Sequence, residues 1–374
     1  MTNTHLIIDK SEDNADLFYK TRFFVPDPCI YIEHKGDKIL ILNDLEIDRG
    51  RQEATVDKVL SFSEYSRKLK GSKKKTAGFA EIVDLVFKEY KIKSATVPGR
   101  FPLKYADTLR KLGYKIIPKN TSPFYEERQI KNSNEIKFLR KSLRDTASSM
   151  KLAVDIISDS SVRKNNLHYK GKLLTSEFVK SEINSFLSRS GYTVSHTIVA
   201  SGVQGSMPHH SGHGPIIVNS PVVIDIFPRS QETGYFGDMT RTVIKGSASD
   251  DLKKMYKTVQ NGQKIGISKI KHGVKTKVVH KAIVEHFEKC GFKTGTLNGK
   301  QQGFIHSTGH GLGLEIHEPP RVSSGDEVLI EGNVVTVEPG LYYEKLGGIR
   351  IEDVIVVTKD GCKALSSFPK KFEV

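Results

Sequence analysis

The chain has 374 residues, 37% of them hydrophobic and 27% charged, which is the composition of an ordinary globular protein with two domains and not that of a disordered chain. Its N-terminus shows no basic segment followed by an apolar one, and nowhere do 18 apolar residues run together, so we expect neither secretion nor a membrane span. The formal net charge of +15 raises the question of a nucleic-acid partner, but the lysines are dispersed and no nucleic-acid-binding motif accompanies them, which argues against one.

The cysteines and the densest basic segment also bear on compartment and partners. Cys29, Cys290 and Cys362 lie far apart and form no C-x-x-C pair, so the sequence predicts neither a disulfide framework nor a thiolate zinc site and fits a reducing cytoplasm. The basic segment from Arg67 to Lys75 has only Tyr65 as an aromatic neighbour, and we interpret it as a solvated loop.

Residues 1–125 have the pattern of a small α/β domain. A hairpin is predicted over residues 29–44, where alternating apolar residues flank a turn at Lys35-Gly36-Asp37. The elements predicted after it are a helix over 81–92, a strand over 94–98, a helix over 101–114 and a strand over 115–118.

Residues 130–374 have the pattern of a larger α+β domain. A polar linker, 119–134, leads to a helix over 135–158 whose N-cap we place at Ser133 or Asn134. The elements predicted next are a helix over 175–192 with Gly191 as its C-cap, strands over 195–202, 222–227 and 235–244, helices over 248–270 and 276–290, and strands over 332–343 and 348–358. Ser247 and Asp250 have capping-box spacing at the start of the helix over 248–270.

The first candidate site residues are two aspartates. Asp225 lies in the apolar strand VVIDIF, where an ionised carboxylate is costly unless it is paired or bound to a cation. Asp238 follows in the next strand, where the two carboxylates can face each other across the ladder. Like charges in that arrangement need a cation, and for this pair alone a structural salt bridge from Arg241 stays open as an alternative.

Two glutamates further along the chain have the same character. Glu338 ends the apolar strand VVTVE, and Glu352 lies among β-branched residues in IRIEDVIVV, where strand alternation puts Arg350 on the same face. Four acids in apolar strands of one region predict a cation-binding site.

Histidines gather in two clusters, one from His209 to His213 and one from His306 to His317. A single histidine is more often a packed or surface residue than a ligand, but glycines at 309, 311 and 313 let the backbone come close to a bound group. One imidazole with four carboxylates suits two divalent ions such as Mn²⁺, Co²⁺ or Zn²⁺. Two such ions, about 3.5–4 Å apart, can share a water and polarise a carbonyl, so the expected chemistry is hydrolysis. The remaining histidines could move protons or stabilise an oxyanion.

The order and flanks of these residues resemble a known family. The segments IDIFPRSQETGYFGDMTRT, HSTGHGLGLEIHE, VEPGLYY and GIRIED look like those of the pita-bread metallopeptidases, which include prolidase, aminopeptidase P and methionine aminopeptidase. The resemblance covers about residues 130–360. It implies an α+β catalytic domain of the pita-bread (creatinase/aminopeptidase) fold, preceded by an α/β domain like that of creatinase and prolidase.

The resemblance also implies a role for each matched residue. The metal ligands would be Asp225, Asp238, His310, Glu338 and Glu352, with Asp238 and Glu352 shared by two ions. Glu338 would also contact a metal-bridging hydroxide as the general base. His209 and His317 would stabilise the transition state beside the substrate carbonyl. Arg350 would support the last ligand or contact substrate, and His306 would lie behind His310.

The N-terminal domain narrows the implied activity. Methionine aminopeptidases usually lack such a domain, so we expect an Xaa-Pro dipeptidase or Xaa-Pro aminopeptidase that acts on short proline-containing peptides. Most peptidases fail at that bond because the proline ring fixes φ and removes an N–H. The resemblance further implies two divalent ions per subunit, Mn²⁺ first and Co²⁺ or Zn²⁺ as alternatives, in a cytoplasmic homodimer.

The sequence departs from the family pattern in three places. The segment between Asp225 and Asp238 is two residues longer than in many members, Ser307 stands where a glycine is usual, and His210 stands where an aromatic residue is common. The last two departures bear on substrate choice.

Two other functions stay open. The chain could instead be a catalytically silent protein of this fold that binds peptide or nucleic acid, or a two-metal hydrolase of a non-peptide amide, ester or organophosphate.

Overall fold

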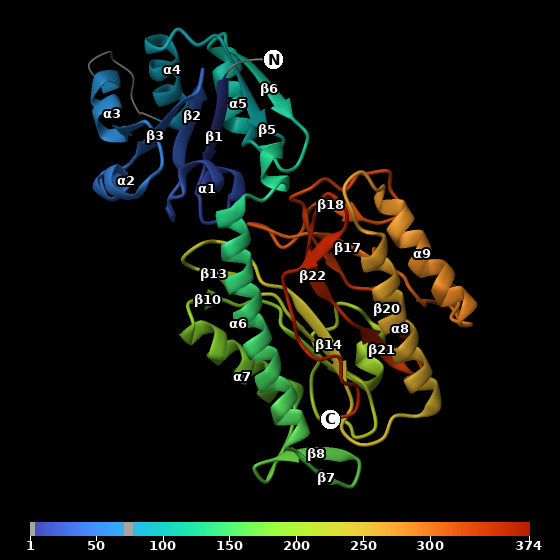
Figure 1. Cartoon of the computed structure of the whole chain (residues 1–374). Coiled ribbons are helices and arrows are strands. Elements are labelled where there is room, and N and C mark those ends of the chain that lie inside the picture. Colours follow the sequence, from blue (N-terminus) through green and yellow to red (C-terminus); the bar gives the residue numbers. More distant parts are fainter. Residues whose placement is uncertain (1–3, 71–77) are drawn as a thin grey trace. The chain divides into compact units, whose positions relative to one another are not determined.

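The computed structural model describes residues 4–70 and 78–374 (Figure 1). The chain forms two compact units, Met1–Arg128 and Gln129–Val374. Most of the basic segment from Arg67 to Lys75, which we interpret as a solvated loop, lies outside the described residues. None of the described helices combines the length and the apolar character that crossing a membrane requires.

The first unit is built on a six-stranded mixed sheet with the order β4-β3-β2-β1-β5-β6. Its strands are β1 (Thr4–Asp9), β2 (Cys29–His34), β3 (Asp37–Leu42), β4 (Lys58–Ser61), β5 (Ser94–Pro98) and β6 (Lys115–Lys119). Its helices are α1 (Ala15–Thr21), α2 (Ile47–Glu53), α3 (Phe62–Lys70), α4 (Phe79–Glu89) and α5 (Leu103–Lys111), and the 3₁₀ helix η1 (Glu126–Gln129) follows. Strands β1, β2 and β3 are antiparallel neighbours, whereas β3–β4, β1–β5 and β5–β6 are parallel pairs.

Apolar residues cover both faces of this sheet. Leu6 and Ile30 pack on one face against helices α4 and α5, and Ile7 and Tyr31 pack on the other against α1. Neighbouring residues of a strand point to opposite faces, so strands with near-continuous apolar sequences suit a sheet covered on both sides. The predicted hairpin is confirmed, with its turn between His34 and Asp37.

The second unit contains four long helices and several small sheets. Its helices are α6 (Ser133–Ser158), α7 (Ser176–Arg189), α8 (Asp250–Lys269) and α9 (Thr276–Lys289), with a 3₁₀ helix η2 (Gly202–Ser206). One three-stranded sheet has the order β11-β12-β14, from β11 (Ile198–Ser201), β12 (Val222–Ile226) and β14 (Met239–Val243). A five-stranded sheet has the order β18-β17-β19-β22-β23, from β17 (Gly309–Gly311), β18 (Glu318–Val322), β19 (Val334–Val337), β22 (Asp353–Val357) and β23 (Cys362–Ala364).

Shorter strands complete the unit. Strands β20 (Gly340–Tyr343) and β21 (Gly347–Arg350) pair with each other, as do β10 (Tyr192–Thr193) with β13 (Arg229–Ser230) and β15 (Gly295–Leu297) with β16 (Lys300–Gln302). Strands β7 (Ser161–Arg163), β8 (Asn166–Tyr169) and β9 (Lys172–Leu173) form a separate three-stranded sheet.

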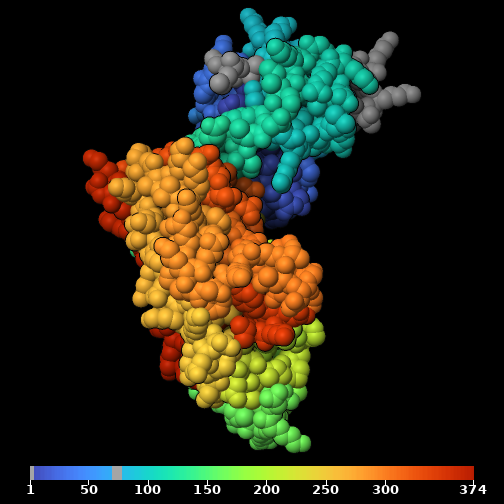
Figure 2. Space-filling model, turned by 90° about the vertical axis from the view of Figure 1, so that its right-hand side faces the viewer, coloured from blue at the N-terminus to red at the C-terminus, as the bar shows by residue number. Residues whose placement is uncertain are grey.

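Two helix pairs cover the sheets of the second unit. Apolar residues of α6 and α7, such as Met150 and Ile183, pack on β12 and β14 through Ile224 and Met239. Helices α8 and α9 pack on β20 and β21 and on the five-stranded sheet. Seen from the side, α8 and α9 form much of the surface of this unit (Figure 2). The sheets therefore have helices behind them and are free to present side chains at their other face.

The two predicted helix N-caps in this unit differ from those in the structure. Helix α6 has its N-cap at Asn132, not at Ser133 or Asn134, because the Asn132 side chain accepts from Glu135 N while the Glu135 carboxylate accepts from Asn132 N. Helix α8 is capped by Ser249, whose hydroxyl accepts from Leu252 N. Ser247 therefore does not cap the helix.

Candidate metal centre

All eight of the predicted site residues line one cavity in the second unit, with a volume of about 660 Å³. These residues are His209, Asp225, Asp238, His310, His317, Glu338, Arg350 and Glu352. The cavity is also lined by His306, which was expected behind His310.

Three of the four acids lie just before a strand or at a break between strands, and the fourth lies within a strand. Asp225 lies within β12, and Asp238 immediately precedes β14. The predicted strands over 332–343 and 348–358 are each interrupted, the first at Glu338-Pro339 between β19 and β20, and the second at Ile351-Glu352 between β21 and β22. A break in the strand frees the glutamate from the alternation of a regular ladder and lets it turn into the cavity.

The relation between the two aspartates differs from the prediction. In the β12–β14 ladder Asp225 is opposite Thr240, and Asp238 comes one residue before the strand begins. The aspartates therefore do not face each other as direct cross-strand partners. They approach the same cavity from the strand and from the loop that precedes its partner.

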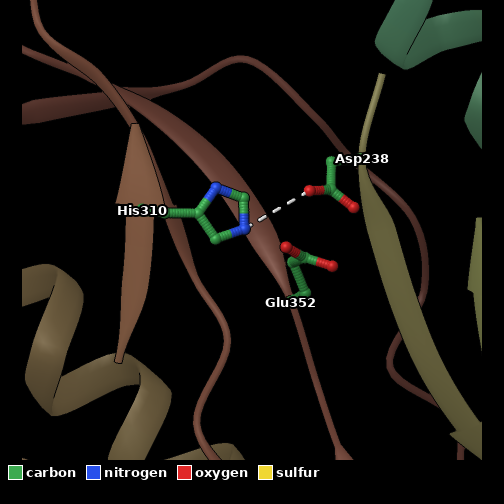
Figure 3. A group of neighbouring side chains, drawn as sticks. All are labelled: Asp238, His310 and Glu352. Carbon is green, nitrogen blue, oxygen red and sulfur yellow. Dashed lines mark ion pairs between the residues drawn. The ribbon is translucent and has the colours of Figure 1, made fainter. Parts of the chain in front are cut away.

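Three of the five expected ligands form a tight group (Figure 3). Asp238, His310 and Glu352 each offer a ligand atom, and these atoms lie within 4.8 Å of one another. His310 Nε2 is 3.7 Å from Asp238 Oδ2 and 3.3 Å from Glu338 Oε1. In Figure 3 the imidazole and both carboxylates point towards a common centre from three separate backbone segments.

The His310 ring has a defined orientation. Its Nδ1 lies 3.1 Å from Gly311 O, to which it can only donate, so Nε2 carries the lone pair. Burial and the nearby His317 lower the pKa of His310 to about 3, and the ring is neutral at pH 7. A lone pair at Nε2 facing two carboxylates is unfavourable unless a proton or a cation lies between them, and metal-binding histidines are oriented in this way.

Burial and the charges of neighbouring acids disfavour ionisation of these carboxyl groups. Burial and the charges of Glu352, Asp225 and Glu338 raise the pKa of Asp238 well above its ordinary range. Burial also raises the pKa of Glu352 strongly and that of Glu338 to about 8, although Arg350 opposes both shifts. Buried acids that raise each other's pKa are stabilised as anions by a cation.

Arg350 compensates one of the four acids. Its Nη2 donates to Asp225 Oδ2 at 2.6 Å, and its Nη1 donates to the Tyr342 hydroxyl at 2.8 Å. That hydroxyl lies 2.9 Å from Nε2 of His306, which gives His306 a supporting role at the cavity wall. The other oxygen of Asp225, Oδ1, is buried without a hydrogen-bond partner.

The alternative that Arg241 neutralises the aspartates is wrong. Arg241 forms its ion pair with Asp353, at 2.7 Å, and the cation at Asp225 is Arg350. Strand alternation explains this, because Arg241 follows Thr240 and points to the opposite side of β14.

The donor set fits a divalent cation. It combines carboxylate oxygens with one neutral imidazole nitrogen, as borderline-to-hard divalent metals prefer. The buried Asp225 Oδ1 without a partner and the cluster of Asp238, His310 and Glu352 both offer free acceptor atoms. The structure therefore supplies ligands for at least one ion.

Two histidines flank this group. The His317 ring packs edge-on against His310 with centroids 4.4 Å apart, and partial burial lowers its pKa, so it is neutral at pH 7. His209 lies on the cavity wall beside Pro208. Of the residues that depart from the family pattern, Ser307 lines the cavity. His210 is partly buried, and its Nδ1 accepts from Gly212 N at 3.0 Å.

The sequence did not reveal several other cavity residues. Ile198 and Phe227 form apolar wall, and Arg321 adds a guanidinium whose Nε donates to Ser307 Oγ at 3.3 Å. Arg321 is four residues past His317 in the sequence. This short distance from a histidine predicted to bind substrate is the feature that could have identified Arg321 as a cavity residue.

Gly309 and Gly311 allow close packing of strands, a role that the sequence pattern did not predict for them. A Cβ on Gly309 would lie 2.0 Å from Thr336 O, and a Cβ on Gly311 would lie 2.4 Å from Pro319 O. These glycines allow β17 to run close to β19 and β18, and that close approach places His310 beside Glu338.

Comparison with known proteins gives one family and a consistent set of relatives. The model of metallopeptidase family M24 matches residues 139–359. An Xaa-Pro dipeptidase of Pyrococcus horikoshii is 30% identical over 336 residues, which are 87% of this chain and 83% of that protein.

Solved structures resemble the whole chain. The X-Pro aminopeptidase of Thermotoga maritima has a TM-score of 0.83 at 25% identity, with 100% of this chain and 98% of that chain covered. The prolidase of Pyrococcus furiosus has a TM-score of 0.79 at 26% identity, covering 98% and 97% of the two chains.

Proposed function

The chain belongs to metallopeptidase family M24, and from this premise we propose that it hydrolyses the Xaa-Pro bond at the N-terminus of dipeptides or short peptides. The expected fold, an α/β domain followed by a pita-bread catalytic domain, is confirmed by the solved structures that cover the whole chain. The observation that carries the proposal is the group of Asp238, His310 and Glu352 inside a cavity that also holds the other candidate residues.

The proposed metal ligands are Asp225, Asp238, His310, Glu338 and Glu352, and we propose that they hold two divalent ions, Mn²⁺ in preference to Co²⁺ or Zn²⁺. Bound there, such ions would lower the pKa of a coordinated water and polarise the scissile carbonyl. The number of carboxylates supports the proposal, because four acids and one imidazole are more than a single closed zinc site requires.

Glu338 is proposed as the general base. Its carboxylate lines the cavity 3.3 Å from His310 Nε2, where it could reach the attacking water, and a carboxylate in that position can accept a proton and return it. Thr336 Oγ1 lies 3.3 Å from Glu338 Oε1 and restricts the carboxylate from the side of the sheet. Glu338 would take the proton of the attacking water and deliver it to the proline nitrogen as the amide bond breaks.

His209 and His317 are proposed to bind the substrate carbonyl. A neutral imidazole can donate one hydrogen bond to the oxygen on which negative charge develops, and such a donor contributes most in the transition state. Arg350, held by Asp225 and Tyr342, would keep the wall of the cavity rigid behind them.

The cavity wall supports a substrate with proline. Ile198 and Phe227 offer apolar surface for the pyrrolidine ring or for the side chain that precedes it. The guanidinium of Arg321 offers a partner for a carboxylate, which in a dipeptide would follow the proline directly.

The remaining proposals concern organisation. We propose an N-terminal domain over 1–125 and a catalytic domain over 130–374, which the division of the chain near Arg128 supports. A cytoplasmic homodimer is proposed by analogy with the family, and the free thiols of Cys29, Cys290 and Cys362 suit a reducing compartment.

The test is hydrolysis of Ala-Pro and Ala-Pro-Ala by protein loaded with Mn²⁺, Co²⁺ or Zn²⁺, with Ala-Ala and the Glu338→Gln variant as controls. We expect alanine to be released from at least one proline substrate, little cleavage of Ala-Ala, and almost no activity in the variant. Tight metal binding without cleavage of any proline peptide would contradict the proposal, and activity on esters or organophosphates alone would favour a non-peptide hydrolase.

A further inference from the structure

Arg241 is a buried cation that lies outside the catalytic cavity. Only 1% of the residue is exposed, and it lies on β14 between Thr240 and Thr242. Thr240 and Thr242 bond to groups of the metal centre and its support, whereas Arg241 points to the other face of the strand. A charge buried this deeply is retained only with a full set of partners.

Every N–H of the Arg241 guanidinium has an acceptor. Nη1 donates to the carbonyls of Thr240, at 2.9 Å, and Glu352. Nη2 donates to Asp353 Oδ1 at 2.7 Å and to Phe368 O at 2.9 Å, and Nε donates to Pro369 O at 3.3 Å. Five donors in the fixed fork of one guanidinium thus join β14, the break before β22 and a C-terminal segment.

One of these acceptors belongs to a proposed metal ligand. The carbonyl of Glu352 accepts from Arg241, and the amide of Glu352 donates to Thr240 O at 3.1 Å. The Glu352 carboxylate in turn accepts from Thr240 Oγ1 at 2.9 Å. Both backbone polar groups of Glu352 are therefore tied to β14, and its side chain leaves that anchor towards Asp238 and His310.

The C-terminal segment, residues 366–374, is fastened along the same strand. Ile244 N donates to Phe372 O at 2.7 Å, and Val374 N donates to Ile244 O at 2.9 Å. Lys370 Nζ is 2.5 Å from Asp353 Oδ2, so that carboxylate joins Arg241 to the segment by two ion pairs. In Figure 1 the C-terminus lies near β14.

We propose that Arg241 is a positioning residue through which the C-terminal segment sets the metal affinity of the site. It fixes the backbone of Glu352, and without the carbonyls of Phe368 and Pro369 the guanidinium would be buried with unsatisfied donors and would lose its orientation. The inference rests on the proposed function only in taking Glu352 as a metal ligand. Arg241 itself touches neither substrate nor metal.

The experiment compares Arg241→Lys with a matched control, Lys245→Met. A lysine at position 241 keeps the charge beside Asp353 but cannot reach five acceptors at once. Lys245 serves as the control because it is a cation just past the end of the same strand, and its Nζ donates to the carbonyl of Ser158, away from the site. Affinity for Mn²⁺ is measured by competition with a fluorescent chelator, and the melting temperature is measured in EDTA. Asp353→Asn is a second variant, chosen because it keeps one acceptor oxygen for Arg241 while it removes the charge and the oxygen that pairs with Lys370.

We expect Mn²⁺ binding by Arg241→Lys to weaken by about 10-fold or more, with activity restored by excess Mn²⁺, because loss of a group that supports a ligand costs roughly 10–100-fold in metal affinity. Asp353→Asn should weaken it less, and Lys245→Met should leave it unchanged. Unaltered affinity in both Arg241→Lys and Asp353→Asn, or an equal loss in the control, overturns the inference. If Arg241→Lys does not fold, Asp353→Asn alone decides. Wild-type protein that binds no divalent metal overturns the proposed function and this inference together.

Discussion

His310 Nδ1 lies within hydrogen-bonding distance of the carbonyl of Gly311, and Arg350 Nη2 donates to one oxygen of Asp225. These two bonds select which atom of each side chain is left for a cation, namely His310 Nε2 and Asp225 Oδ1. A sequence motif names the residue that binds but not the atom. The hydrogen bonds around the proposed ligands therefore specify which atom is available to a cation, and the order of residues in the sequence does not.

Substitutions at Asp238 and His317 should separate metal binding from catalysis. Asp238→Asn removes a charge at the centre of the ligand group, so we expect metal content and activity to fall together. His317→Ala removes only a proposed donor to the substrate carbonyl, so metal should stay bound while kcat falls by about 10²–10³-fold. Metal content by atomic spectroscopy and steady-state kinetics check both. Loss of metal in His317→Ala would show that its proposed role is wrong.

Arg321 should distinguish a dipeptide from a longer substrate. If its guanidinium binds the terminal carboxylate, Arg321→Met should raise KM for Ala-Pro by about 10-fold or more and affect Ala-Pro-NH₂ much less, since a hydrogen bond to a charged group contributes roughly 1.5–3 kcal/mol. Ser307→Gly is the accompanying variant, because the serine hydroxyl contacts Arg321 Nε, and a smaller change of the same kind is expected. Equal effects on both substrates would place the carboxylate elsewhere.

The elements were largely predictable from the sequence, whereas their breaks and relative registers were not. The apolar alternation around Glu338 and Glu352 predicts strands, and strands are found on both sides of each acid. Alternation cannot show that the strand is interrupted at the acid, because a functional side chain leaves the ladder for reasons of tertiary structure. For the same reason the ladder partner of Asp225 is Thr240 and not Asp238.

Close strand packing at Gly309 gives an element-scale prediction. A Cβ there would meet Thr336 O at 2.0 Å, so Gly309→Ala should push β17 from β19 and cost about 1–3 kcal/mol of stability together with metal affinity. Gly361→Ala, at a turn of the same sheet where nothing lies within 4 Å of the new carbon, is the matched control. Chemical denaturation and metal titration measure the two effects. Identical behaviour of the two variants would contradict this account of the glycine.

Across the whole molecule, the site depends on segments far apart in the chain. Asp225 lies in the three-stranded sheet, His310 in the five-stranded sheet and Glu352 between β21 and β22, so the cavity exists only when those sheets are in place. The acidic residues of the cavity could be identified from the sequence, because an ionised carboxylate in an apolar strand is costly unless it is paired or bound to a cation. Arg321 lies outside the matched motifs, and only its short distance in sequence from His317 pointed to it, whereas the pairing of Arg241 with Asp353 depends on tertiary structure.

The stability of metal-free protein should fall as pH rises. In the folded state Glu338 has a pKa of about 8 against an ordinary value of 4.5, and the pKa values of Asp238 and Glu352 are also raised. A carboxyl with a raised pKa in the folded state contributes full stability below its unfolded pKa, and that stability is lost as pH rises through the folded pKa. The melting temperature in EDTA should therefore drop between about pH 5 and pH 8 more steeply than with Mn²⁺.

Calorimetry at several pH values in EDTA and in Mn²⁺ checks this prediction. Glu338→Gln removes one of the carboxyls with a raised pKa, so its curve in EDTA should be flatter than that of the wild type. Parallel curves for chelated and metal-loaded protein would count against metal binding at these acids.

The fastening of residues 366–374 along β14 has a consequence for synthesis on the ribosome. Asp225 and Arg241 emerge from the exit tunnel well before Phe368 and Pro369, whose carbonyls complete the surroundings of the guanidinium. A nascent chain that stalls before those residues holds an arginine without its final acceptors, and one that stalls before Glu352 also lacks a proposed metal ligand. Translation must therefore pass Glu352 before all five proposed ligands exist, and a chain released between Glu352 and Phe368 should bind Mn²⁺ more weakly than the full-length chain.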